Sequence, residues 1–79
     1  MILVKLTGAF IKLAPMENVK GSFDLDYQPD LTLSQLVDNL GVKNLNIKYS
    51  VMVNNSRKPE DYELNDSDSV LILPLLAGG

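Results

Sequence analysis

The sequence predicts an α+β fold in which one main helix lies across a mixed sheet. Apolar and polar residues alternate over residues 1–7 and again over residues 22–27, which is the pattern of half-buried strands. The middle of the chain changes to a helical repeat. A long connection that contains this helix separates the first and last strands, so they can lie side by side in parallel.

Two strands are expected ahead of the helix. Residues 1–7 and 22–27 both alternate between apolar and polar positions, which predicts two strands paired as a hairpin. Gly8 ends the first strand and Pro29 ends the second. Residues 9–21 form a broad connection between them.

The helix is expected over residues 32–40. Thr32 followed by Gln35 is the pattern of a capping box, and Gly41 occupies the position of a left-handed C-cap. The apolar residues fall at i, i+3, i+4 and i+7, which makes one buried stripe: Leu33, Leu36, Val37 and Leu40.

The segment after the helix is less regular. Residues 42–50 give no clear prediction, and residues 51–53 form a short apolar strand. Residues 54–56 are expected to turn, because asparagine tolerates positive φ. Residues 59–62 are expected to be irregular or to form a single helical turn.

The chain closes with a turn, a strand and a tail. Residues 65–68 have turn composition, and residues 70–73 form the last strand, which Pro74 stops because proline cannot donate to a ladder. We therefore expect one domain over residues 1–74 and a flexible, extended tail over residues 75–79.

Composition favours a small globular domain of the cytoplasm. The 79 residues are 46% hydrophobic, which suits a single compact core. The apolar runs are too short to span a bilayer, and no basic segment precedes a long apolar one, so we expect neither membrane association nor export. The net charge is −3 and the lysines and arginine are scattered, which argues against nucleic-acid binding.

Several kinds of chemistry are excluded by composition. The chain has no cysteine and no histidine, so it has no disulfide, thiolate nucleophile, Cys/His zinc site or histidine base. Acidic residues gather over residues 60–68 but lack the spacing of an EF-hand, so we expect no metal site. Nothing groups a nucleophile with a base, and we expect no enzymatic activity of the chain alone.

The feature that points to chemistry is the pair Gly78 and Gly79 at the end. Two terminal glycines arise by chance in about 0.5% of chains, and a frayed tail is the alternative explanation. Five extended residues reach at most about 17 Å. Residues without Cβ can enter a narrow channel. Such a tail could deliver its carboxylate to a partner, which must first activate it, most plausibly as an acyl-adenylate made with ATP.

The last strand is apolar on both faces. A single helix buries only one face of a sheet, so one pair of its side chains should be exposed. We expect Leu71 and Leu73 on the outer face, with Leu3 and Met52 as candidate neighbours. A contiguous exposed apolar patch usually marks a partner site. The alternative is that residues 8–21, which include Phe10 and Leu13, fold over this face.

Four segments of the chain follow a known pattern: residues 32–36 (start of the helix), 51–54 (strand ending in Val-Asn), 64–68 (turn usually written Leu-x-Asp-Gly-Asp) and 70–79 (last strand, proline and Ala-Gly-Gly end). In these segments the chain resembles the MoaD/ThiS group of ubiquitin-like sulfur carriers, which share the β-grasp fold. It departs from that group's pattern at two positions: Ser67 replaces the usual turn glycine, and Leu75 replaces a common second proline.

The resemblance implies a carrier and its partners. An adenylating enzyme resembling the ubiquitin-activating enzymes uses ATP to activate the carboxylate of Gly79, and a persulfide donor converts it to a thiocarboxylate. A synthase then receives the sulfur, and the carrier acts as that synthase's small subunit, holding no cofactor or metal of its own. The residues expected to contact partners are Leu3, Leu71, Leu73, Pro74, Leu75, Leu76 and Ala77.

Four functions stay open. The long connection over residues 8–21 and the presence of Pro74 resemble the small subunit of molybdopterin synthase, which favours sulfur delivery to the large subunit for molybdenum or tungsten cofactor. A carrier for thiazole synthase, in thiamine synthesis, is the first alternative. A ubiquitin-like modifier joined to proteins through Gly79 is the second, and the apolar tail favours a carrier over such a modifier. An interaction module whose diglycine is incidental is a further alternative.

Overall fold

A computed structural model describes residues 1–75 of the chain. Three kinds of element follow one another along it: five strands, one α-helix and two 3₁₀ helices. In chain order they are β1 (Ile2–Leu6), η1 (Gly8–Leu13), β2 (Ser22–Leu25), α1 (Leu33–Leu40), η2 (Val42–Leu45), β3 (Tyr49–Val53), β4 (Ser56–Arg57) and β5 (Ser69–Pro74).

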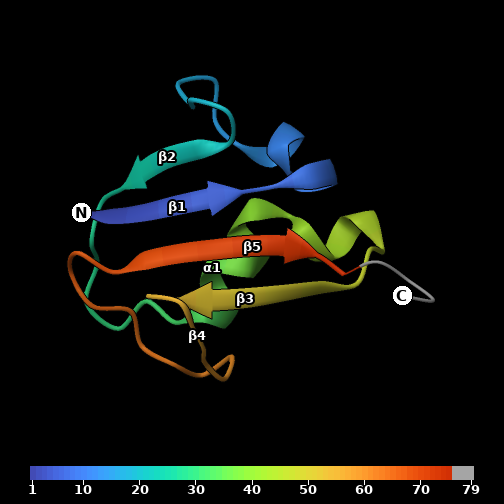
Figure 1. Ribbon diagram of the computed structural model, residues 1–79. Helices are drawn as coiled ribbons and strands as arrows, with labels where there is room; N and C mark the ends of the chain where they lie inside the picture. The colour runs from blue at the N-terminus through green and yellow to red at the C-terminus, as the bar shows by residue number, and fades with distance from the viewer. Residues whose placement is uncertain (76–79) are drawn as a thin grey trace.

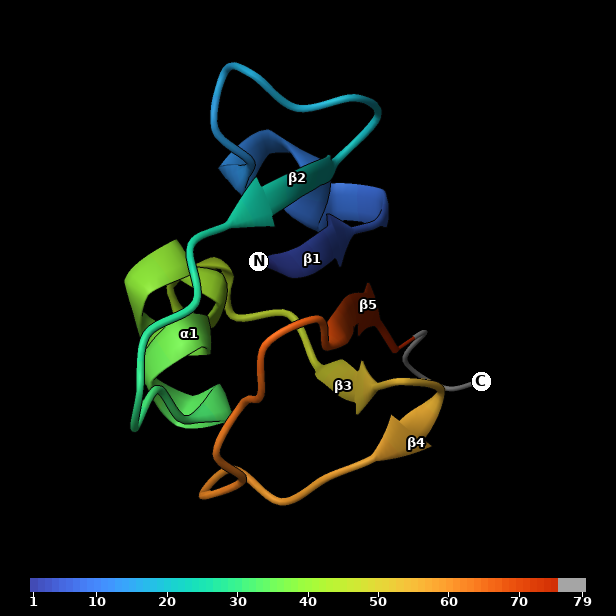
Figure 2. The ribbon, with the colours of Figure 1, turned by 90° about the vertical axis from the view of Figure 1, so that its left-hand side faces the viewer.

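The strands form one mixed sheet in the order β2-β1-β5-β3-β4. β1 and β5 are parallel neighbours at its centre, and Val4 lies opposite Val70. The other pairs are antiparallel. Figure 1 shows β1 and β5 running in the same direction, and Figure 2 shows α1 on one side of the sheet. The predicted α+β fold, with its parallel first and last strands, is confirmed.

The core lies between the sheet and α1. Leu36 and Val37 are 2% and 3% exposed, which confirms the predicted helical stripe, while Leu40 is only half-buried. Six strand residues on the helix side are buried: Ile2, Val4, Leu6, Val53, Val70 and Ile72. Tyr49 and Val51 of β3 face the same way and are half-buried.

Both ends of α1 are closed as predicted. The N–H of Gln35 donates to Oγ1 of Thr32 at 3.2 Å, and the N–H of Thr32 donates to Oε1 of Gln35 at 3.0 Å. This reciprocal pair satisfies donors that the first turn of a helix leaves free. At the other end Gly41 has φ of +79°, the left-handed conformation that glycine adopts without strain.

Three elements were missed by the sequence prediction: η1, η2 and β4. Residues 8–13 form η1, which turns Phe10 into the core, where its ring packs edge-on against Tyr49 with centroids 6.2 Å apart. β4 is only two residues long and follows a two-residue turn in which Asn54 and Asn55 have φ of +52° and +68°. Positive φ at both positions is what a tight hairpin requires, so the predicted turn is confirmed and extended into a hairpin.

Residues 59–62 do not form a helix. The N–H of Tyr62 donates to the carbonyl of Pro59 at 3.0 Å, which closes a single turn. The backbone here is instead bonded to the start of α1: Leu33 N–H donates to the Tyr62 carbonyl and Ser34 N–H to the Glu60 carbonyl. These bonds hold the segment against the helix terminus and satisfy N–H groups of the first turn.

The acidic segment before β5 has a structural role. The buried carboxylate of Asp68 accepts hydrogen bonds from Asn54 Nδ2 at 2.9 Å, Tyr62 Oη at 3.2 Å and the Asn65 N–H at 2.8 Å. Asn54 Oδ1 in turn accepts from the Ser69 N–H at 2.9 Å. A buried charge persists only where it is bonded in this way. Asp68 therefore ties the 65–68 turn to the β3–β4 hairpin.

Candidate functional site

The predicted reactive end begins where β5 stops. Leu75 is the last described residue, so the positions of Leu76, Ala77, Gly78 and Gly79 lie outside the described part of the chain. The boundary between a 1–74 domain and a 75–79 tail remains a prediction. The structure does describe Leu75, from which those residues continue, and we call Leu75 the tail root.

The tail root is held from both sides of β5. On the β3 side, Pro74 lies opposite Tyr49, and the N–H of Leu75 donates to the carbonyl of Lys48 at 2.8 Å. On the β1 side, the N–H and Oγ1 of Thr7 both donate to the carbonyl of Ile72, each at 3.2 Å. β5 therefore ends at Pro74, and one further backbone hydrogen bond holds Leu75, the last described residue.

The surface beside this root is accessible. Leu75 is 42% exposed, whereas Pro74 is half-buried. A shallow hollow adjoins Leu75 and is lined by Asn46, Ile47, Lys48 and Tyr49. A partner that receives the tail would meet this mixed apolar and polar rim first.

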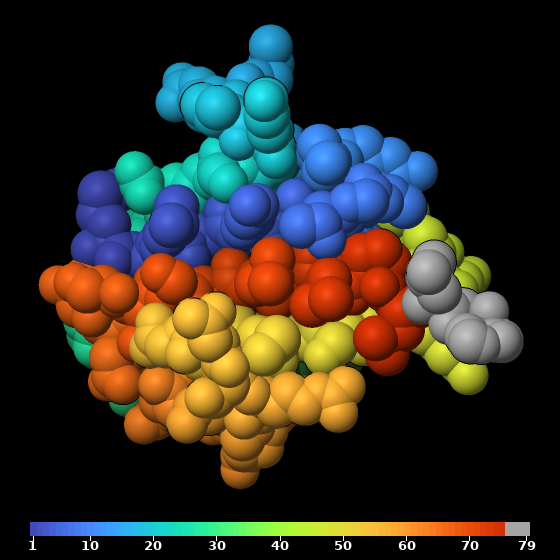
Figure 3. Space-filling view, in the orientation of Figure 1, coloured from blue at the N-terminus to red at the C-terminus, as the bar shows by residue number. Residues whose placement is uncertain are grey.

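The outer face of the sheet is the second part of the candidate site. Leu3 is 44% exposed, while Leu71, Leu73 and Met52 are half-buried because neighbouring strands flank them. The register places Leu71 opposite Met52 and next to Lys5. Figure 3 shows this face, with β1, β5 and β3 side by side. The predicted apolar side chains therefore share the outer face, but Leu71 and Leu73 are less exposed than expected and Lys5 lies beside Leu71.

The alternative in which residues 8–21 cover this face is wrong. Phe10 is fully buried on the helix side, and Leu13 packs against the same core. A hollow of about 510 Å³ stays open on the outer face, and its lining is Leu3, Lys5, Met52, Asn54, Asn55, Ser69, Val70 and Leu71.

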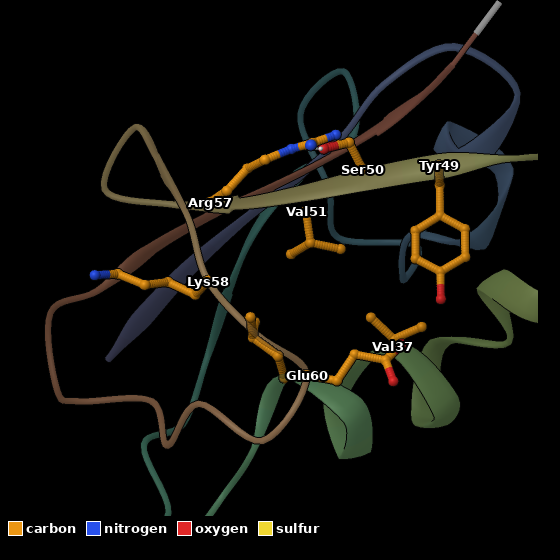
Figure 4. A pocket seen from close by; sticks show the side chains of 8 residues that line it. Val37, Tyr49, Ser50, Val51, Arg57, Lys58 and Glu60 are labelled. Carbon is orange, nitrogen blue, oxygen red and sulfur yellow. Dashed lines mark hydrogen bonds between the residues drawn. The ribbon is translucent and has the colours of Figure 1, made fainter.

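A third hollow was missed by sequence reasoning. It measures about 440 Å³ and opens where the chain after β4 leaves β3 and turns toward α1. Figure 4 shows Val51 and Tyr49 pointing from β3 toward Val37, while Arg57 lies on the other side of the strand. Arg57 Nε donates there to Ser50 Oγ at 3.2 Å. The residues come from three separate elements, so no local pattern could have identified them.

Two exposed ion pairs shift pKa values among the described residues. The hydrogen bond and charge of the N-terminal ammonium group lower the pKa of Asp66, which it contacts directly. Asp38 raises the pKa of Lys43, whose Nζ lies 3.3 Å from Asp38 Oδ1. Neither pair combines a nucleophile with a base. Within residues 1–75, no group of acidic side chains is placed to hold a metal ion, and no helix has the length and apolarity to cross a bilayer.

Comparison with protein families gives one match. The model of the ThiS family matches residues 13–79, which is most of the chain and includes β3, β5 and the tail but not β1. Comparison with curated protein sequences gives no match.

Comparison with solved structures gives several close folds. Molybdopterin converting factor subunit 1 from Pyrococcus furiosus is 18% identical with a TM-score of 0.74, covering 95% of this chain and 97% of that one. SAMP1 from Haloferax volcanii is 15% identical with a TM-score of 0.70 and coverage of 99% and 98%. Urm1 from Trypanosoma brucei is 24% identical with a TM-score of 0.71 and coverage of 99% and 94%. At these identities the matches establish a shared fold.

Proposed function

This chain belongs to the ThiS family of ubiquitin-like β-grasp sulfur carriers, and from that premise we propose that Gly79 carries sulfur as a C-terminal thiocarboxylate. Members of this family are small carrier subunits that work with adenylating enzymes and synthases. The observation that carries the proposal is the family match itself, which runs through β5 to the diglycine. The hydrogen bond from the Leu75 N–H to the Lys48 carbonyl, which holds the start of the tail, also supports the proposal.

The proposed chemistry needs three steps, all catalysed by partners. A carboxylate oxygen of Gly79 attacks the α-phosphorus of ATP, forming an acyl-adenylate and releasing pyrophosphate. A persulfide sulfur then attacks the acyl carbon and expels AMP, which leaves an acyl disulfide. A thiol reduces this disulfide and releases the thiocarboxylate. The chain contributes the carboxylate and no side-chain thiol, in keeping with its lack of cysteine.

We propose molybdopterin synthesis as the destination of the sulfur. The fold match to a molybdopterin converting factor subunit supports this choice, together with the long connection over residues 8–21 and the proline at the end of β5. Thiazole synthesis is the alternative within sulfur transfer. A role as a protein modifier is a second candidate, supported by the fold match to a small archaeal modifier protein from H. volcanii.

The deciding experiment follows the mass of the chain. Intact protein is incubated with ATP, a family adenylating enzyme, a persulfide donor and a thiol, and its mass is then measured. We expect one oxygen to be exchanged for one sulfur. Deleting Gly79, or adding one residue after it, displaces the carboxylate by about 3.3 Å. A displacement of that size should abolish the exchange, because displacements of about 1 Å already cost about 10²-fold.

The controls separate the candidates. Both tail variants should unfold at the same denaturant concentration as the intact chain, since the tail lies beyond the last strand. Passing the sulfur to a molybdopterin synthase large subunit but not to a thiazole synthase supports the preferred destination. Conjugates to other proteins that survive denaturing gels would support the modifier, and equal reaction of the truncated chain would exclude the sulfur carrier.

A further inference from the structure

Gly8 touches the end of β5 in a way that only glycine allows. It follows β1 directly and has φ of +57°. A Cβ placed on Gly8 would lie 2.8 Å from Cγ and 3.3 Å from Cδ of Pro74. Side chains essentially never approach that closely, so the Pro74 ring occupies the space that a side chain at Gly8 would need. Pro74, the residue before Leu75, is therefore packed directly against the backbone of Gly8.

Gly8 completes a set of restraints around Pro74. Leu75 is bonded to Lys48, Pro74 lies opposite Tyr49, and Thr7 donates twice to the carbonyl of Ile72. Gly8 begins η1, and the ring of Phe10 in the same helix packs on Tyr49, so η1 contacts both Pro74 and its cross-strand partner Tyr49. We call this set the tail clamp: Thr7, Gly8, Lys48, Tyr49 and Pro74.

We propose that the tail clamp fixes the origin and direction of the reactive tail, and that Gly8 is a positioning residue that acts through Pro74. The inference rests on the proposed sulfur-carrier function and adds no covalent step to it. Leu75 is held by its hydrogen bond to Lys48, so four residues remain beyond it, and they span at most about 13 Å at roughly 3.3 Å each. With so short a tail, the position that the terminal carboxylate can reach depends on where the tail starts.

The clamp also restrains a root that is otherwise exposed, since Leu75 is 42% exposed. A terminal segment that is not tied down samples many conformations, and ordering it costs conformational entropy. Holding Pro74 and Leu75 in advance removes part of that cost before the carboxylate enters the partner. A displaced root would leave docking intact and misplace the carboxylate, which affects turnover more than affinity.

The first test compares two glycines with positive φ. Gly8→Ala places a methyl group against Pro74, whereas Gly41→Ala, at φ of +79° with its nearest contact the side chain of Asn44 at 3.5 Å, introduces similar backbone strain without touching a residue of the tail clamp. In the thiocarboxylation reaction we expect Gly8→Ala to lower kcat about tenfold or more with KM for the carrier unchanged. Gly41→Ala should match the intact chain in both constants.

A second readout needs no partner. The Leu75 N–H is bonded to the Lys48 carbonyl, so its hydrogen exchange reports whether the clamp is closed. We expect its protection to be lost in Gly8→Ala and kept in Gly41→Ala. Equal behaviour of the two variants in kcat and in exchange would overturn the inference, as would a rise in KM with kcat unchanged.

The third test asks whether Gly8 acts through Pro74. Pro74→Ala removes both ring atoms that a Cβ at Gly8 would meet, so Gly8→Ala/Pro74→Ala should recover kcat to the level of Pro74→Ala alone. If the two substitutions lower kcat multiplicatively in the double variant, Gly8 does not act through Pro74 and the proposal is overturned. If Gly8→Ala fails to fold, Pro74→Ala carries the test by itself: unchanged kcat and unchanged Leu75 exchange exclude the clamp. Failure of the intact chain to form any thiocarboxylate would instead exclude the proposed function.

Discussion

On β5, Val70 and Ile72 point toward α1 and are 2% and 0% exposed, whereas Leu71 and Leu73 point to the face that no helix covers. The four side chains have similar apolar character. Their different surroundings come from the single helix, which buries one face and leaves the other to solvent or to a partner. The comparison teaches that one strand can stabilise the fold with alternate residues and offer the rest for binding.

The largest expected effect tests the inner face. Leu36→Ala should lower the free energy of unfolding by about 2–5 kcal/mol, because it leaves a cavity between α1 and the sheet. Leu3→Ala is the matched control: the same substitution on the outer face, at a side chain that is 44% exposed, should change stability by about 0.5 kcal/mol. Denaturant unfolding measures both, and equal costs would mean that the two faces do not differ.

The next effect tests the outer face. Leu71→Asp, or Leu73→Asp, should weaken binding to the adenylating partner by more than about 1.5 kcal/mol, as expected for a desolvated apolar contact, with little loss of stability. Isothermal titration and an unfolding curve separate these two quantities. Ile72→Asp, one position away on the same strand, should unfold the domain instead. If Leu71→Asp also unfolds it, the outer face belongs to the core.

The smallest expected effect concerns the ion pair between the N-terminal ammonium group and Asp66. The N-terminal ammonium group lowers the pKa of Asp66, so this pair stabilises the fold above the usual carboxyl pKa and loses its contribution as pH falls through the depressed pKa. Both partners are exposed, so the effect should be small and reduced by salt. Between pH 5 and pH 2, about the range where carboxyl groups titrate, Asp66→Asn should lose less stability than the intact chain. Equal losses would show that the pair contributes nothing.

Much of the fold was predictable because its signals are local. Alternation predicted β1 and β2, an apolar run ended by Pro74 predicted β5, and the stripe that contains Leu36 predicted α1 together with both caps. The apolar outer face followed from β5 having apolar residues on both of its faces. The half-burial of Leu71 and Leu73 did not follow, because it depends on the side chains that adjacent strands place beside them.

Other features had no adequate local signal. η1 and the two-residue β4 are too short to show a period, and the role of Asp68 depends on Asn54 and Tyr62, which the folded chain brings to it. The acidic residues around it lack the spacing of a calcium-binding loop, and nothing in their sequence indicates this structural role. The hollow between β3 and α1 was likewise invisible before the elements were assembled.

The sequence by itself determined the alternating strands, the capped helix, the lack of cysteine and histidine, and a diglycine end that implies chemistry at a carboxylate. These are properties of single residues or of neighbours within one or two turns. Only the tertiary structure decided that Thr7 bonds to Ile72, 65 positions away, and that Gly8 makes room for Pro74. Such contacts depend on how β1, β5 and η1 pack, because a side chain's pattern shows which way it faces but not what it meets.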